Sequence, residues 1–284
     1  MSNGILIVNK PEGISSQGVV NRIKKILNVK KCGHAGTLDP LATGVLPILI
    51  GSYTKLSKYL IEHDKIYRAV IKLGEKSSTG DREGEIIETK SIPKNINKEN
   101  IINTLNSFLG VQTQIPPIYS SIKIKGKKLY EYARKGEKVD IPKREIRIYN
   151  INLVKFDKKN NTIEFEVSCS KGTYIRTLCE DIAEKLGTVG FMLELNRTKV
   201  NMFSIDESYK LEEIETGNYR IIEMENIFKD LQKIYLSNRK LELFLNGVNL
   251  SFELPDGLYN IYYEKNYIGL GIVKNQLLKR DVII

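Results

Sequence analysis

Hydrophobic and polar residues alternate in two stretches of the chain, which predicts half-buried β-strands. Residues 66–73 place Tyr67, Ala69, Ile71 and Leu73 on one face. Residues 163–169 repeat this pattern with Ile163, Phe165, Val167 and Cys169. Two continuous apolar runs, residues 4–8 and 46–50, predict short buried strands.

Hydrophobic residues at helical spacing predict three helices between these strands. The first carries its apolar positions over residues 19–27 and is capped by Ser15 or Ser16. The second and third lie over residues 101–109 and 178–186, and each is stopped by the glycine that follows. The irregular mixture of strands and helices predicts an α/β (α+β) fold with a mixed sheet against which helices pack.

An acidic stretch over residues 206–230 marks the expected domain boundary. Beyond it the apolar runs are short, and turn signals stand at Asn-Gly 246–247 and Asp-Gly 256–257. We therefore expect a larger domain over residues 1–232 and a small β-rich domain over residues 233–284.

The net charge of +10, from 44 basic and 34 acidic residues, is unevenly distributed. Residues 1–60 and residues 120–150 each carry a net charge of +6, whereas residues 206–230 hold eight acids against three basic residues. A basic face attracts phosphate backbones, although solvated faces of a lysine-rich protein give the same composition.

Composition also argues against several classes of protein. The first apolar run ends at Asn9, too early for a signal-peptide core or a membrane span, so we expect a cytoplasmic protein with no membrane partner. The three cysteines lack CxxC spacing and the chain has two histidines, so we expect neither a metal site nor a disulfide framework.

A loop punctuated by glycines is expected over residues 30–43, and within it Gly33–Gly44 is the most informative segment. Its glycines let the backbone approach a ligand closely, and Pro40 favours an extended conformation at Asp39, which suits a carboxylate held out from the loop. A plain turn capped by Asp39 explains the same residues.

Tyrosines and one arginine form further candidates. Tyr67 lies at the start of a predicted strand, and Tyr174 and Arg176 lie where a strand passes into a helix. A tyrosine offers a flat face for a base, and a guanidinium pairs well with a carboxylate. Core aromatics and a surface charge are the alternative.

A third group of candidate residues follows Gln114–Tyr119, in a basic insertion expected over about residues 120–150 of the larger domain. It reads either as an exposed basic hairpin and helix or as an arm that grips RNA, in which Tyr119, Tyr130 and Tyr132 alternate with cations. The candidate backbone-binding cations are Lys123, Lys125, Lys127, Lys128 and Arg134.

Together these segments resemble the TruB family of tRNA pseudouridine synthases, which modify uridine 55 in the T loop. The matching segments follow the family's order and are Asn9–Ser16, Gly33–Gly44, Lys65–Tyr67, Gln114–Tyr119, Gly172–Leu178 and Leu195–Thr198. The resemblance implies the pseudouridine synthase fold, a mixed and largely antiparallel sheet with flanking helices, followed by a small RNA-binding domain of PUA type.

The resemblance also implies a role for each matching residue. Asp39 would be the catalytic carboxylate, Arg176 would pair with it, and Tyr67 would pack on the flipped uracil and assist proton transfer. His34 would enter the T loop in place of displaced bases. The residues around the base would be Tyr174, Leu195 and, in the opening segment, Lys10.

Pseudouridine formation breaks the bond from N1 to C1′, turns the uracil and rejoins it through C5. No electron or phosphoryl group is gained or lost, so we expect no cofactor. A carboxylate can carry the intermediate, and stacking on aromatic rings offsets the cost of flipping the base out. We expect a monomer that binds the tRNA T arm.

Two other functions compete with this one. A non-catalytic protein that binds or folds tRNA would need the basic stretches but not Asp39, Tyr67 and Arg176. A hydrolase with an Asp39 nucleophile would leave the basic stretches unexplained. Two departures from the family pattern, Ser121 and Asn201, avoid the proposed site, and asparagine tolerates the positive φ that a glycine would adopt at position 201.

Overall fold

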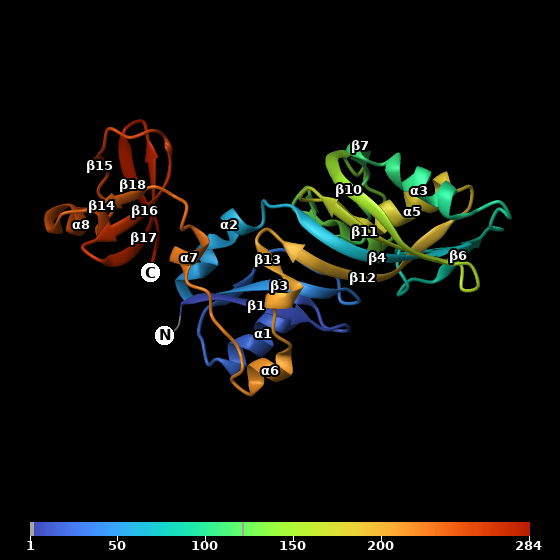
Figure 1. Cartoon of the computed structure of the whole chain (residues 1–284), viewed down its shortest axis with the longest axis horizontal. Coiled ribbons are helices and arrows are strands. Elements are labelled where there is room, and N and C mark those ends of the chain that lie inside the picture. The colour runs from blue at the N-terminus through green and yellow to red at the C-terminus, as the bar shows by residue number, and fades with distance from the viewer. Residues whose placement is uncertain (1–2, 121) are drawn as a thin grey trace.

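The computed structural model describes residues 3–120 and 122–284, so Ser121 lies outside the described residues. Its largest sheet has nine strands. They are β1 (Gly4–Lys10), β2 (Cys32–His34), β3 (Thr43–Ile50), β4 (Lys65–Leu73), β7 (Gly110–Gln114), β10 (Arg144–Asp157), β11 (Thr162–Cys169), β12 (Gly190–Val200) and β13 (Phe203–Ser204). Seven follow the order β1-β3-β12-β4-β11-β10-β7, while β2 pairs with β3 and β13 with β12 (Figure 1). The pair β3 and β12 is parallel and the other pairs are antiparallel, so the sheet is mixed and largely antiparallel, as predicted.

Three smaller sheets accompany the large one. Two are hairpins, β5 (Glu75–Ser77) with β6 (Ile86–Thr89) and β8 (Lys123–Ile124) with β9 (Lys127–Lys128). The third has the strands β14 (Lys233–Tyr235), β15 (Leu250–Ser251), β16 (Gly257–Tyr263), β17 (Asn266–Lys274) and β18 (Leu277–Ile283). Its order is β14-β16-β17-β18-β15, and it stands apart from the large sheet in Figure 1.

The helices are short. They are α1 (Ser16–Ile26), α2 (Ser57–Leu60), α3 (Lys98–Asn106), α4 (Leu129–Lys135), α5 (Ile175–Lys185), α6 (Leu211–Glu215), α7 (Met224–Ile227) and α8 (Asn238–Leu245), with the 3₁₀ turns η1 (Gly51–Leu56) and η2 (Ile205–Glu207). No helix in the described part of the chain has the length and apolarity needed to cross a bilayer.

Helices α3 and α5 cover one face of the half-sheet formed by β4, β11, β10 and β7 (Figure 1). The predicted alternation is confirmed there, because the inward residues of β4 and β11 are buried in one core. This core includes Ala69, Ile71, Phe165 and Val167 from the sheet, and it positions the end of α5 next to β4.

The other half of the sheet, β1 and β3, is buried on both faces. Ile5 and Ile7 point into one core and Leu6 and Val8 into another, since successive side chains of a strand point to opposite faces. Helices α1 and α6 cover the second core. The first core also contains Leu270 and Val282, which attach the C-terminal sheet to the large one, and the Tyr59 hydroxyl donates to Asp281 at 2.5 Å across the same contact.

The predicted ends of the elements are partly right. Ser15 caps α1, where its Oγ accepts from the Gly18 amide at 3.0 Å, and Gly187 follows α5 with φ +85°. Asn201 adopts φ +52°, as the sequence predicted for that turn.

Three predictions need correction. The expected loop over residues 30–43 contains the short strand β2, which pairs with β3. Helix α3 ends at Asn106, before the predicted stop, and Leu109 beyond it is 43% exposed. The turn at 246–247 ends α8 instead of joining two strands, and this helix was not predicted.

Candidate active site

A cavity of about 600 Å³ is lined by five of the predicted site residues. Its walls come from the loop at Gly36–Asp39, from β4, from the segment 170–176 and from β12. Asp39, Tyr67, Tyr174, Arg176 and Leu195 all line it. The sheet order explains why these residues meet. Strand β12, which carries Leu195, lies between β3, which follows the loop of Asp39, and β4, which carries Tyr67.

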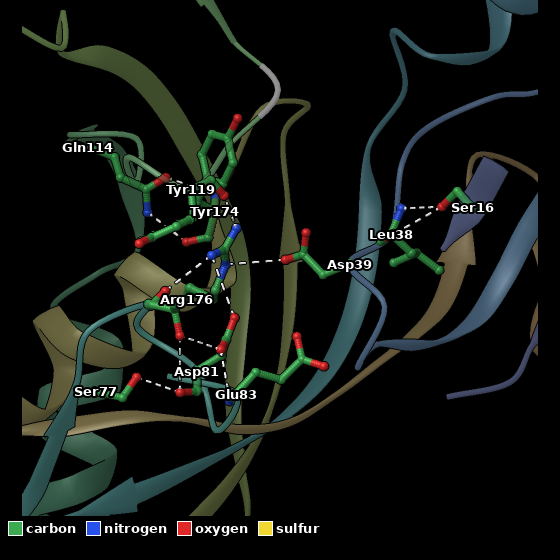
Figure 2. Close-up of polar contacts among 11 residues, drawn as sticks. Ser16, Leu38, Asp39, Ser77, Asp81, Glu83, Gln114, Tyr119, Tyr174 and Arg176 are labelled. Carbon is green, nitrogen blue, oxygen red and sulfur yellow. Dashed lines mark hydrogen bonds and ion pairs between the residues drawn. The ribbon is translucent and has the colours of Figure 1, made fainter. Parts of the chain in front are cut away.

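The loop around Asp39 is fixed on both sides of the carboxylate. Before it, the Ser16 hydroxyl donates to the Leu38 carbonyl at 3.0 Å and accepts from the Leu38 amide at 2.8 Å (Figure 2). After it, the Pro40 carbonyl accepts from the Lys10 ammonium at 3.0 Å and from the Gly13 amide at 2.9 Å. The opening segment of the chain therefore sets the position of Asp39.

Lys10 corrects one prediction. Its side chain is fully buried, and its ammonium donates to the carbonyls of Pro11, Ile14 and Pro40 at 2.7 to 3.0 Å. All three of its donors are thus used by the backbone. Burial lowers the pKa of Lys10 to about 8, against the opposing effect of Asp39. Lys10 therefore holds the loop, and it is not among the residues that line the cavity.

Arg176 joins two carboxylates and two loops (Figure 2). Its Nε lies 3.2 Å from Asp39 Oδ2, and its Nη1 lies 3.6 Å from Asp81 Oδ2. Nη1 also donates to the Thr79 carbonyl at 3.1 Å and Nη2 to the Tyr119 carbonyl at 2.7 Å. The guanidinium therefore pairs with Asp39 through Nε and uses its other nitrogens elsewhere. It distributes its donors over four groups and is itself 4% exposed.

Asp81 is a site residue that the sequence analysis missed. It is 4% exposed, and its Oδ1 accepts from Thr79 Oγ1 at 2.6 Å and from the Glu83 amide at 3.1 Å. Gly80, at φ +75°, allows this tight turn beneath Arg176. The turn Ser-Thr-Gly-Asp carries no distinctive spacing, so no signal in the sequence separates it from an ordinary surface turn.

Burial and the neighbouring charges act on the pKa of the Asp39 carboxylate in opposite directions. Burial in the cavity raises its pKa above the ordinary value, and the negative charge of Asp81 adds to that effect. Arg176 and, more weakly, Lys10 lower it. Since the side chain is still 39% exposed, the carboxylate is both accessible from the cavity and oriented by Arg176.

Tyr67 and Leu195 form the apolar part of the cavity. Tyr67 lies on β4 and is 9% exposed, and Leu195 lies on β12 and is 8% exposed. Burial raises the pKa of the Tyr67 phenol, whereas the nearby Arg197 guanidinium lowers it. A base placed here would meet a ring and an aliphatic side chain, as stacking and a dry pocket require.

Tyr174 is held by its backbone at the other side of the cavity. The Gln114 side chain accepts from the Tyr174 amide at 2.8 Å and donates to the Tyr174 carbonyl at 3.0 Å (Figure 2). The Arg144 guanidinium lies 5.7 Å from the centre of the Tyr174 ring. Gln114, which is 3% exposed, belongs to a segment that the sequence singled out without assigning it this function.

His34 lies on β2 and is not among the residues that line the cavity. It is half-buried, and its Nδ1 has no hydrogen-bond partner in the part of the chain that the structure describes. Burial lowers the pKa of His34, and the charge of Arg197 adds to this, so the imidazole is neutral at neutral pH.

The basic segment, residues 122–136, forms the hairpin of β8 and β9 followed by α4, which matches the hairpin and helix suggested by the sequence. Lys123, Lys125, Lys127 and Arg134 are exposed and Lys128 is half-buried. Two tyrosines organise these cations: Lys128 and Arg134 lie 5.3 and 5.4 Å from the Tyr130 ring, and Lys127 lies 5.7 Å from the Tyr132 ring.

These groups can perform cofactor-free acid–base and nucleophilic chemistry on a planar base. The cavity combines an oriented carboxylate, a phenol, a permanent cation and an apolar wall. Within residues 3–120 and 122–284, no cluster of His, Cys, Asp and Glu has the arrangement of a metal site.

Comparison with known protein families identifies two matching regions. Residues 24–175 match the model of the TruB family pseudouridylate synthase N-terminal domain, and residues 176–237 match the tRNA pseudouridylate synthase B C-terminal domain.

Individual relatives extend this similarity to nearly the whole chain. The tRNA pseudouridine synthase B of Clostridium tetani is 44% identical, with 95% of each chain covered. That of Bacillus subtilis is 43% identical, with 90% of this chain and 85% of the relative covered.

Among solved structures, similar chains occur in a Cbf5-Nop10-Gar1 complex and in an H/ACA RNP bound to a substrate RNA containing 2′-deoxyuridine. The first has a TM-score of 0.68 at 24% identity and covers 99% of this chain and 83% of the other. The second has a TM-score of 0.69 at 22% identity and covers 99% and 85%. At these identities the likeness concerns the fold.

Proposed function

The chain belongs to the TruB family of pseudouridylate synthases and is an isomerase that acts on a uridine of tRNA, and we propose that its target is uridine 55 in the T loop. The observation that carries this proposal is the ion pair of Asp39 with Arg176 inside a cavity that also presents Tyr67 and Leu195. A binding protein would not need a carboxylate fixed at both neighbouring residues and paired with a buried cation.

We assign the chemistry to Asp39. With its carboxylate ionised, Asp39 supports cleavage of the bond from C1′ to N1, and the uracil leaves with the electron pair of that bond. The base turns within the cavity, C5 bonds to C1′, and C5 loses its proton while N1 gains one. Tyr67 and Leu195 keep the detached base in place, Arg176 orients the carboxylate, and Tyr174 closes the far wall.

We further propose that the basic segment grips the backbone of the T arm. Lys123, Lys125, Lys127 and Arg134 are exposed, Lys128 is half-buried, and none of the five lines the cavity, so a phosphate backbone can reach them from outside. His34 would then enter the T loop from β2. We propose that the catalytic residues belong to a domain over residues 1–232, with a PUA-type RNA-binding domain over residues 233–284. We also propose that the enzyme works as a monomer in the cytoplasm.

The test uses a T-arm stem-loop whose uridines carry tritium at C5. Rejoining through C5 expels this hydrogen, so release into water measures isomerisation. We expect stoichiometric release by the wild type without added metal or nucleotide. A stem-loop with cytidine in place of uridine 55 should release none, which assigns the position.

Asp39→Asn is the matching protein variant. We expect it to lose activity by about 10⁴-fold or more, because the essential carboxylate is gone, while its affinity for the stem-loop stays within about threefold. Tight binding without release by the wild type would mean a binding protein, and an active Asp39→Asn would remove Asp39 from its role.

A further inference from the structure

Arg197 is a second buried arginine at the cavity, and no part of the mechanism above uses it. Its side chain is 1% exposed, and it lies on β12 directly opposite Tyr67 on β4. Side chains of residues paired in this way start about 5 Å apart. Buried arginines are normally paired with carboxylates, yet no ion pair in the described part of the chain involves Arg197.

Backbone carbonyls hold the guanidinium instead. Nε donates to the Val45 carbonyl at 2.9 Å, Nη2 to the Gly36 carbonyl at 3.1 Å and Nη1 to the Thr37 carbonyl at 3.4 Å. Gly36 adopts φ +94°, and a Cβ there would stand 3.5 Å from Nη1, so the loop is shaped to close on this cation. The positive charge is thus fixed in place but not neutralised.

The remaining donors have one clear neighbour. A guanidinium has five N–H groups and no acceptor, and three of the five are used by the carbonyls. The Tyr67 side chain faces Arg197 across the pair of β4 and β12, and both side chains line the cavity. Because Arg197 can only donate, a hydrogen bond between the two would run from the guanidinium to the phenol oxygen, and it would leave the phenol hydrogen free to point elsewhere.

We propose that Arg197 is a positioning residue that acts through Tyr67: it directs the phenol hydrogen toward the base in the cavity and balances the negative charge when that proton leaves. The inference rests on the proposed function, since it concerns the proton transfers of the isomerisation. The buried Arg197 cation then has a negatively charged partner, the Tyr67 phenolate, only during the reaction.

The proton balance of the reaction supports this assignment. Isomerisation adds one proton to N1 of the detached uracil anion and removes one from C5 after the new bond to C1′ forms. Tyr67 can perform both transfers: the phenol gives its proton to the uracil anion, and the resulting phenolate takes the proton from C5. The phenol is regenerated and no other reactant is needed. Between the two steps the phenolate stands beside Arg197, where a fixed charge stabilises it without reorganisation.

A double-mutant cycle tests the proposal by single-turnover tritium release. Arg197→Gln keeps a donor but removes the charge, and we expect it to lower the rate by about 10²-fold, at the lower end of what acid–base groups contribute. Affinity for the stem-loop should stay within about threefold. In a Tyr67→Phe background the same change should alter the rate by less than about threefold, because the group through which Arg197 acts is absent.

Arg68→Gln is the matched control. Arg68 is the next residue on β4, but it is exposed and pairs with Glu164, so we expect its rate to stay within about twofold of the wild type. An undiminished effect of Arg197→Gln in the Tyr67→Phe background would overturn the proposal, because Arg197 would then act only through the loop carbonyls. A wild type that releases no tritium would overturn the proposed function as well.

A more acidic phenol at position 67 separates the two possible roles of Arg197, because a purely structural role would not depend on the acidity of that phenol. Placing 3,5-difluorotyrosine at position 67 should restore part of the rate lost in Arg197→Gln, because the phenolate then needs less support. Should Arg197→Gln fail to fold, the same replacement in the wild type should move the alkaline loss of activity to lower pH. An unchanged pH profile would show that Tyr67 carries no charge, and this would overturn the proposal.

Discussion

The cavity and the basic segment both concentrate charge, but they do so in opposite ways. In the cavity a few charged groups are buried and held by hydrogen bonds, as with Arg176 and its four partners. In residues 122–136 the cations are many and mostly exposed, and three of them, Lys127, Lys128 and Arg134, lie against tyrosine rings. Fixed charges determine the rate of a chemical step, whereas mobile exposed charges contribute to affinity and respond to salt.

The largest effect that separates the two regions should come from Arg176→Lys. An ammonium can replace one of the four contacts of the guanidinium, so Asp39 would lose its orientation. We expect single-turnover tritium release to fall by about 10²-fold or more, with little change in RNA affinity. Near-normal release would remove Arg176 from its role, and Arg68→Lys, at an exposed arginine that pairs with Glu164 and does not line the cavity, is the control for substitution as such.

The basic segment should show the opposite pattern. We expect the double variant Lys127→Ala, Lys128→Ala to weaken stem-loop binding by about tenfold at low salt and to reduce the slope of log affinity against log salt by about 1.5, because two phosphate contacts are lost. The single-turnover rate at saturating enzyme should stay near that of the wild type. A lower saturated rate with an unchanged salt slope would mean that this segment takes part in the chemistry instead.

A smaller effect concerns the pH dependence of the cavity. Asp39 must be ionised to act, and its pKa is raised by burial and by the charge of Asp81. Activity is therefore lost as the pH falls through that raised pKa. Asp81→Asn removes a negative charge and should lower the pKa of Asp39, so the acid limb of the pH–rate profile should move to lower pH. A shift to higher pH would show that Asp81 acts mainly by holding Arg176 in place.

The smallest effect is expected from an ion pair that lies neither in the cavity nor in the basic segment. Arg22 and Glu215 pair at 2.7 Å on the surface, and each side chain is 42% exposed. Arg22→Ala should change the free energy of unfolding by less than about 1 kcal/mol, measured by urea denaturation, and should leave tritium release unchanged. A larger loss of stability would show that the contact of α1 with α6 depends on this pair.

Much of the fold follows from local patterns in the sequence. The alternation at Tyr67–Leu73 and at Ile163–Cys169 determined two central strands, because a strand with one buried face requires that period. Ser15 and Gly187 marked helix ends through their own backbone and side-chain chemistry. Helix α8 escaped prediction, since its Asn-Gly end reads equally as a hairpin turn.

In the candidate site, too, some residues follow from the sequence and others only from the tertiary structure. The sequence by itself placed Asp39, Tyr67, Tyr174, Arg176 and Leu195 in short segments whose order resembles one enzyme family, and the cavity brings all five together. The tertiary structure alone decided that Lys10 holds the loop, that Asp81 shares Arg176, and that Arg197 faces Tyr67 without a carboxylate. Whether a buried cation binds a substrate, a carboxylate or the backbone depends on which strands become neighbours, and such contacts between distant segments leave no period or spacing in the sequence.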